Sequence, residues 1–167
     1  MPDLKSLSKE AIPAALEKAM RYRLLNEPGE AESICLDVLK ADPENQEAII
    51  TLLLALTDRF VKGYSVSDTQ AKELLGRIKG EYDRNYYCGI FAERRAKAKL
   101  QQHTPDSRFQ AFDLLTEAMN WFEKAEKMRP PGNDDALLRW NACARLFERH
   151  PELAVRDDER TAPVMLE

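Results

Sequence analysis

Apolar residues along most of the chain recur at intervals of three and four positions, which is the period of an α-helix. No stretch shows the sustained alternation of apolar and polar residues that is typical of a half-buried β-strand. The pattern predicts seven helices, at about residues 8–25, 30–41, 44–61, 67–79, 82–102, 106–128 and 134–149. We therefore expect an all-α protein.

The ends of these helices carry residues that break or cap a helix. Pro43 ends the second helix, because the residue before a proline is pushed out of the helical region. Helix N-caps are expected at Ser67, at Asp106 or Ser107, and at Asn133. The third helix is apolar nearly all round, so we expect it in the middle of the domain.

One spacing occurs twice, at the second helix and again at the sixth. In both helices a small residue is followed at steps of four, three and five by a larger residue, another apolar residue and a proline. The two sets are Ala31, Cys35, Val38 and Pro43, and Ala118, Phe122, Ala125 and Pro130. The small residue allows a partner helix to approach closely, and the larger residue one turn later fills the remaining gap. The spacing therefore indicates a repeated helix pair.

This spacing resembles the second helix of the tetratricopeptide repeat, or TPR, family. The resemblance implies a right-handed array of three antiparallel helix pairs, at about 9–43, 44–80 and 82–130, with a capping helix at 133–149. The array would form a single domain of residues 1–150, followed by a flexible tail, 151–167. The second repeat departs from the family pattern, since it has the extra residues VKGYSVS and Asp83 in place of the proline. A generic helical bundle is the alternative.

In this family the first helix of each pair lines a concave surface that commonly binds peptides. The resemblance places nine residues on that surface: Leu16, Met20, Arg23, Ile50, Leu54, Asp58, Tyr86, Ile90 and Arg94. The capping helix would add Leu137 and Asn141. Leu16 and Met20 stand where the family's carboxylate clamp has Lys and Asn, so the clamp is missing.

We therefore expect a mainly apolar groove that suits a partner helix or an extended apolar peptide. The competing interpretation is that these residues are core. In that case the third helix would be buried, for example under one of the chain's own termini.

Charge is segregated along the chain. Residues 27–58 carry eight acidic residues against Lys40, whereas residues 59–100 carry ten basic residues against five acidic ones. The densest basic part is a helix face with Arg94, Arg95, Lys97 and Lys99. The alternative function is an assembly protein that uses this face to bind an acidic partner or RNA. No exposed aromatics interleave the bases, so nucleic acid is the less favoured ligand, and the opposite charges would also suit self-association.

The remaining composition offers little chemistry. The chain has 167 residues, a net charge of −4, and 44% hydrophobic and 32% charged residues, which suits a folded domain. His103 and His150 lie near helix ends, and no phosphate-binding loop or metal-ligand spacing occurs. The three distant cysteines point to a reducing compartment, and no apolar run is long enough for a membrane span. We expect a cytoplasmic, non-catalytic module that binds a protein or peptide without cofactor or metal.

Overall fold

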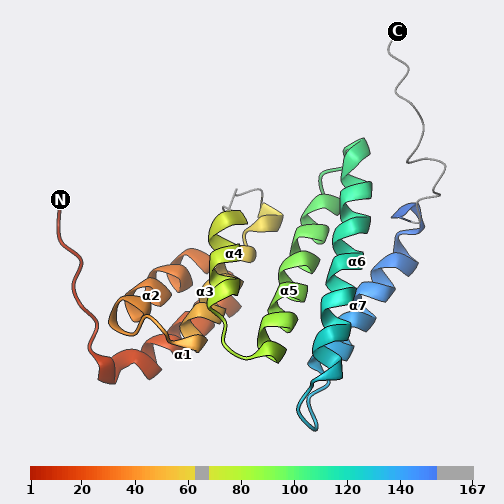
Figure 1. Ribbon diagram of the computed structural model, residues 1–167. Coiled ribbons are helices and arrows are strands. Elements are labelled where there is room, and N and C mark those ends of the chain that lie inside the picture. The colour runs from red at the N-terminus through yellow and green to blue at the C-terminus, as the bar shows by residue number, and fades with distance from the viewer. Residues whose placement is uncertain (63–67, 154–167) are drawn as a thin grey trace. The chain divides into compact units, whose positions relative to one another are not determined.

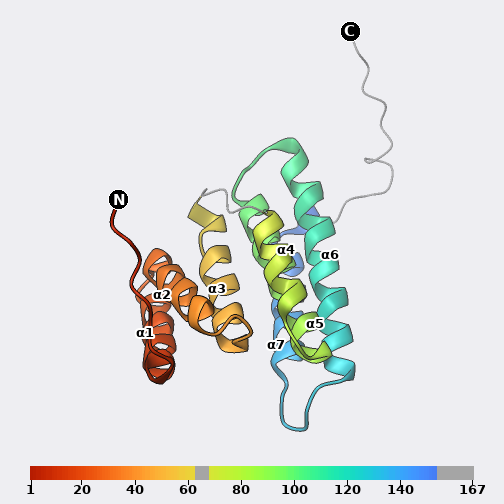
Figure 2. The same cartoon turned by 60° about the vertical axis from the view of Figure 1, so that its left-hand side comes forward.

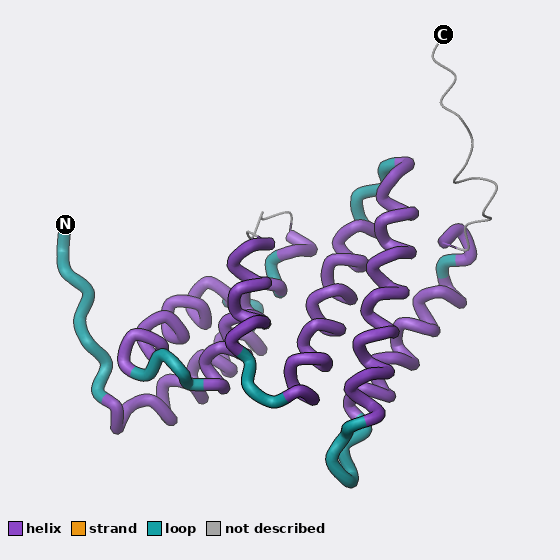
Figure 3. Tube along the Cα trace, in the orientation of Figure 1, coloured by secondary structure: helices purple, strands orange, loops and turns teal. Residues whose placement is uncertain are grey.

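A computed structural model describes residues 1–62 and 68–153, and within these ranges it is built from helices without a strand (Figure 3). The α-helices are α1 (Ile12–Leu24), α2 (Pro28–Ala41), α3 (Gln46–Thr57), α4 (Asp68–Arg77), α5 (Glu81–Leu100), α6 (Pro105–Lys127) and α7 (Asp135–Arg149). Short 3₁₀ helices cover Lys9–Ala11, Phe60–Lys62 and Pro151–Leu153. The predicted all-α class is confirmed, and the ends of the seven predicted helices agree within a few residues, except where the third prediction continues past Thr57.

The chain forms two compact units, Met1–Tyr87 and a second from Cys88 onward, with the boundary inside α5. In the first unit α1 packs against α2 and α3, α2 packs against α3, and α3 packs against α4 (Figures 1 and 2). One side of α1 is buried at Ile12, Leu16 and Ala19, which follow the helical period. Each of the helices α1 to α4 therefore packs against a neighbour in the chain.

Helix α3 is buried on most of its surface, as its sequence predicts. Leu52, Leu53 and Leu56 are all buried, and Thr57 donates its hydroxyl hydrogen to the Leu53 carbonyl at 2.9 Å. The Asn45 side chain caps the helix by accepting a hydrogen bond from the Ala48 amide at 2.9 Å. The apolar composition of α3 thus reflects its place between α2 and α4.

The six residues other than proline in the repeated spacing are all in the core. Ala31, Cys35, Val38, Ala118, Phe122 and Ala125 are each 0% exposed, whereas the two prolines of the pattern are exposed. The matching residues of α4 and its end, Ala71, Leu75 and Ile78, are buried as well. The interpretation of these positions as packing residues is therefore confirmed.

In the second unit α6 packs against α7, and the 3₁₀ helix Pro151–Leu153 packs against both. Leu153 is fully buried, so the packed chain extends past residue 151, where the flexible tail was expected to begin. The rest of the expected tail, 154–167, lies outside the described residues.

Two of the expected N-caps need correction. Helix α6 begins at Pro105, so Thr104 is its N-cap residue, and Asp106 and Ser107 lie inside the helix. Helix α7 begins at Asp135, and the Asn133 side chain accepts from the Asp135 amide at 3.0 Å from one position before the N-cap. The side chains of the two observed N-cap residues, Thr104 and Asp134, make no capping hydrogen bond. Ser67 lies outside the described residues.

Candidate functional site

Leu16 is a core residue and not part of an exposed groove, contrary to the expectation from the TPR resemblance. Its exposed fraction is 3%, and it packs in a cluster with Ile12, Val38 and Ala48. This cluster joins α1 to α2 and to the start of α3. Leu16 therefore holds the helices together and is not available to a partner.

Met20, Ile50 and Leu54 are the accessible apolar residues of the expected groove within the first unit. Met20, one turn after Leu16, is 36% exposed, and Ile50 and Leu54 are half-buried one turn apart on α3. Because α1 packs against α3, these three side chains belong to neighbouring helices. We call them, with Arg23 and Asp58, the α1–α3 face.

Arg23 and Asp58 form a bidentate ion pair at one end of this face. Arg23 Nε lies 2.8 Å from Asp58 Oδ2, and Arg23 Nη2 lies 3.3 Å from Asp58 Oδ1. Both side chains are mostly buried, and Arg23 Nη1 also approaches Met20 Sδ at 3.5 Å. The pair joins the end of α1 to the end of α3, so the two charges neutralise each other and fix the relative positions of the helices.

Two further contacts anchor the turn that follows α3. Arg59 Nη2 lies 2.5 Å from Glu32 Oε2 of α2, and Lys62 Nζ donates to Asn26 Oδ1 at 2.9 Å. Asn26 itself has a positive φ of 61°, a conformation that asparagine tolerates better than most residues. The helices that form the α1–α3 face are therefore connected at their ends by hydrogen bonds and ion pairs.

The three groove residues expected on α5 fall on both sides of the boundary between the units. Tyr86, in the first unit, is half-buried, and its ring stacks on Tyr82 at a centroid distance of 6.1 Å. Ile90, in the second unit, is buried, and Arg94 is half-buried. With an exposed fraction of 3%, Ile90 is a core residue like Leu16, contrary to the groove expectation, whereas the membership of Tyr86 and Arg94 in one surface with the α1–α3 face stays a prediction.

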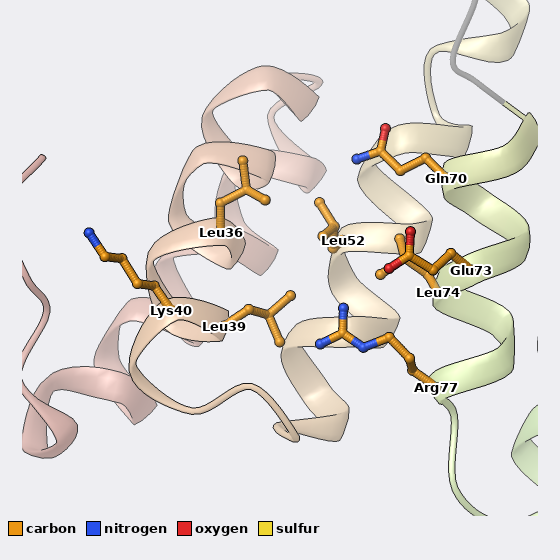
Figure 4. A pocket seen from close by; sticks show the side chains of 8 residues that line it. All are labelled: Leu36, Leu39, Lys40, Leu52, Gln70, Glu73, Leu74 and Arg77. Carbon is orange, nitrogen blue, oxygen red and sulfur yellow. The ribbon is translucent and has the colours of Figure 1, made fainter.

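A second feature of the first unit is a groove between α2 and α4 (Figure 4). It has a volume of about 320 Å³ and is lined by Leu36, Leu39 and Lys40 of α2, Leu52 of α3, and Gln70, Glu73, Leu74 and Arg77 of α4. We call it the α2–α4 groove. The sequence offered one signal for it, because Leu36 and Leu39 are apolar but do not belong to the repeated spacing of α2.

The α2–α4 groove has an apolar floor and a polar wall. Leu52 and Leu74 are buried at its base, whereas Leu36 is 48% exposed. Arg77 Nη2 donates to the Pro43 carbonyl at 2.6 Å, which holds the guanidinium in place. The Gln46 side chain adds a bridge from the start of α3, since it donates to the Arg77 carbonyl at 3.3 Å and accepts from the Lys79 amide at 2.7 Å.

The expected basic face of α5 is partly occupied by contacts within the second unit. Lys97 Nζ lies 2.5 Å from Glu93 Oε1, and the Arg95 guanidinium lies 5.5 Å from the centre of the Phe91 ring. Lys99 Nζ lies 3.4 Å from Gln102 Oε1. The cluster therefore presents less unpaired positive charge than its sequence indicates.

Glu93 is the most deeply buried charged residue of the described chain, at 1% exposure. Its Oε1 faces Lys97 and, at 3.5 Å, Arg139 Nη1 of α7, while Oε2 has no hydrogen-bond partner among the described residues. Burial, and then the Glu93 charge, raise the pKa of the neighbouring Cys143 thiol to about 12. Such a thiol stays protonated near neutral pH.

The hollow between α6 and α7 contains Leu137 and Asn141, the residues expected from the capping helix. It has a volume of about 280 Å³ and is also lined by Glu123, Glu126 and Trp140. The Trp140 indole donates to Glu123 Oε1 at 3.2 Å, and Arg129 Nη1 lies 2.9 Å from Glu126 Oε1. Both carboxylates of the hollow therefore already have partners within the second unit.

The described residues show few groups that are set up for chemistry. Burial raises the pKa of Cys35 to about 12, and His150 Nδ1 lies 2.8 Å from Glu152 Oε1 at the surface, where the hydrogen bond lowers the pKa of Glu152. Within residues 1–62 and 68–153, no group of three or more His, Cys, Asp or Glu side chains could hold a metal ion. None of the helices in these ranges is long and apolar enough to cross a bilayer.

Comparisons of the chain with protein-family models, with curated protein sequences and with solved structures found no match. The functional proposal therefore depends on the geometry and charge of the chain's own residues. Within the first unit, the two accessible features are the α1–α3 face and the α2–α4 groove.

Proposed function

We propose that this chain is a non-catalytic interaction module that binds a partner helix or an extended apolar peptide on the α1–α3 face. The observation that carries the proposal is the exposed Met20 of α1 and the half-buried Ile50 and Leu54 of α3, on two packed helices that the Arg23–Asp58 ion pair joins. The ion pair fixes the two helices before a partner arrives. A partner then loses less conformational freedom on binding than it would on a mobile surface.

A TPR-like array is the architecture that best fits this role. Each of α1, α2 and α3 packs against the next helix, and α1 also packs against α3, as stacked helix pairs require. The buried small residue and large residue of the repeated spacing support the same arrangement in α2 and α6. The proposed array has three right-handed antiparallel pairs, with α7 as its cap.

Several features favour binding over catalysis. Cys35 and Cys143 are buried thiols with a pKa of about 12, so neither is a ready nucleophile. Three cysteines without a disulfide suit a reducing compartment such as the cytoplasm. The basic face of α5 is the weaker candidate for the contact, because Lys97 and Arg95 already pack against Glu93 and Phe91.

The test is affinity capture with the full-length chain from a lysate of cells that express it, at about 0.1 M and about 1 M salt, where the Debye length falls from about 10 Å to about 3 Å. Captured proteins are identified by mass spectrometry, and the affinity of each purified candidate is then measured. Met20→Glu places a charge on the α1–α3 face, where Met20 is 36% exposed, and Leu138→Glu places one at a more exposed apolar position of α7, at 61%.

We expect a partner that is retained at high salt, lost with Met20→Glu and kept with Leu138→Glu, because apolar contacts are screened little by salt. A partner that is lost at high salt but kept by Met20→Glu would contradict the proposal. That result would move the contact to a charged surface such as the basic face of α5.

A further inference from the structure

We propose that the α2–α4 groove is a second docking site, which takes a short peptide segment of a partner protein with apolar side chains next to an acidic one. This site is separate from the α1–α3 face. Leu52 lies about 200° around α3 from both Ile50 and Leu54, so it faces the opposite side of the helix. One chain would therefore present two surfaces on opposite sides of α3.

The apolar part of the ligand follows from the four leucines that line the groove. Leu36 and Leu39 extend from α2, and Leu52 and Leu74 close the base (Figure 4). Nearly half of the Leu36 side chain is exposed, so this leucine is accessible from the open side of the groove. A volume of about 320 Å³ is at the lower end of the range for ligand pockets, so the groove suits a few side chains of a peptide.

The acidic part of the ligand follows from the charges at the end of the groove. Arg77, the last residue of α4, extends toward Leu39 in Figure 4 and is held by its hydrogen bond to the Pro43 carbonyl. Lys40, in the last turn of α2, points away from Leu52 in this view, but its long exposed side chain can turn toward an acidic group. Arg77 is therefore the cation that faces the groove, and Lys40 is a second cation at the outer edge of the α2 wall.

The position of Lys40 in the sequence strengthens this argument. It is the only basic residue among residues 27–58, a segment with eight acidic residues. The single cation of the acidic segment thus lies on the groove, across from Arg77. Glu73, one turn before Arg77 on the same wall, would face the basic or donor end of the ligand. Such an arrangement of charge selects the orientation and the partner more than it adds affinity.

The experiment is a selection of random 16-residue displayed peptides on the full-length chain, followed by fluorescence anisotropy with synthetic versions of the enriched sequences. Leu36→Glu and Lys40→Glu change exposed residues of the groove, so both variants are expected to fold, which circular dichroism checks. Met20→Glu tests the α1–α3 face in parallel, and Leu138→Glu is the matched control on α7.

We expect enriched peptides that combine apolar residues with an acidic one. Leu36→Glu should weaken their binding by about tenfold or more, since a charge then faces the leucine floor. Lys40→Glu should weaken it by about threefold and reduce its dependence on salt. Met20→Glu and Leu138→Glu should leave the affinity unchanged, and amide resonances of Leu39, Gln70 and Arg77 should shift on titration.

Three results would overturn the proposal. The first is a selection without enriched peptides, and the second is enriched peptides that are basic or carry no acidic residue. The third is a set of peptides that bind Leu36→Glu as tightly as the original chain but lose affinity for Met20→Glu. In the third case the α1–α3 face keeps its proposed role, so the two proposals can fail independently.

Discussion

Phe122 of α6 lies so close to Gly89 of α5 that a Cβ atom on Gly89 would be 2.5 Å from the Phe122 ring. Phe122 is fully buried, so its ring cannot swing out of the way into solvent. A glycine at this crossing lets the two helices approach to the distance that the aromatic ring needs.

Gly89→Ala should therefore destabilise the second unit, although alanine is the better helix former. Overpacking of this kind costs about 1–3 kcal/mol, which exceeds the gain of about 1 kcal/mol in helix propensity. The measurement is denaturant unfolding followed by the fluorescence of Trp121 and Trp140, both of which lie in the second unit.

Gly76→Ala is the matched control, because Gly76 lies inside α4 and a Cβ there would meet no atom within 4 Å. This change should stabilise the chain by about 0.5–1 kcal/mol, as measured by circular dichroism at 222 nm, the usual helix signal. Equal effects of the two substitutions would show that the Phe122 contact has no energetic consequence.

The contrast between Leu16 and Met20 shows where prediction from sequence ends. Both residues lie on one stripe of α1, and the period of the helix assigns them to the same face. Their exposure differs because Leu16 packs with Val38 of α2 and Ala48 of α3, whereas Met20 lies one turn further on. Which turn of a helix is covered depends on the crossing of the helices, and the sequence does not encode that crossing locally.

The core positions of α2 were predictable because they depend on local features of the sequence. Ala31, Cys35 and Val38 follow each other at helical steps, and Pro43 ends the helix by its covalent geometry, so local rules are sufficient. The α2–α4 groove was missed because the lining residues of its two walls are about 30 or more positions apart in the chain. Its shape depends on the distance between α2 and α4, which the packing of α3 and the hydrogen bonds of Arg77 and Gln46 at the end of α4 determine.

The Arg23–Asp58 pair should contribute measurably to stability, because it is bidentate and mostly buried. Asp58→Asn should lower the free energy of unfolding by about 1–2 kcal/mol, since it removes a charge-assisted hydrogen-bonded pair. Glu17→Gln breaks the exposed pair with Arg21 and should change stability by less than about 0.5 kcal/mol. Denaturant titration with the Arg23→Gln single and double variants would isolate the coupling, and a coupling near zero would contradict the assignment.

Glu93 should lower the stability of the second unit. Its carboxylate is buried with Oε2 unpartnered, while Lys97 and Arg139 are each more than one-third exposed and can return to water. Glu93→Met should therefore be neutral or stabilise the fold by about 1 kcal/mol, because an apolar group of similar length suits the site better.

Removal of the cations should have the opposite effect at the same site. A chain with both Lys97→Met and Arg139→Met leaves the buried carboxylate without compensation and should lose about 3 kcal/mol of stability. Thermal and denaturant unfolding of the two variants can be compared directly. A large loss of stability with Glu93→Met would instead identify the ion cluster as a net source of stability.

The buried thiols predict both a pattern of chemical labelling and a dependence on pH. Cys35 and Cys143 have a pKa of about 12 in the folded chain, against 9.0 for an ordinary thiol, mainly because burial disfavours the thiolate. At pH 8 only about one molecule in 10,000 would carry either thiolate. Iodoacetamide should therefore modify half-buried Cys88 first, and Cys35 and Cys143 only after unfolding, as peptide mass spectrometry would show.

The same pKa difference should make the fold less stable at alkaline pH. The folded state holds the thiol protons more tightly than the unfolded state, so this contribution is complete below about pH 9 and is lost as the pH rises from 9.0 toward about 12. The variant Cys35→Ala should show a smaller fall in unfolding free energy across this range than the original chain. Parallel pH profiles of the two chains, or modification of native Cys35 as fast as Cys88, would contradict the assignment of Cys35 as a protonated core thiol.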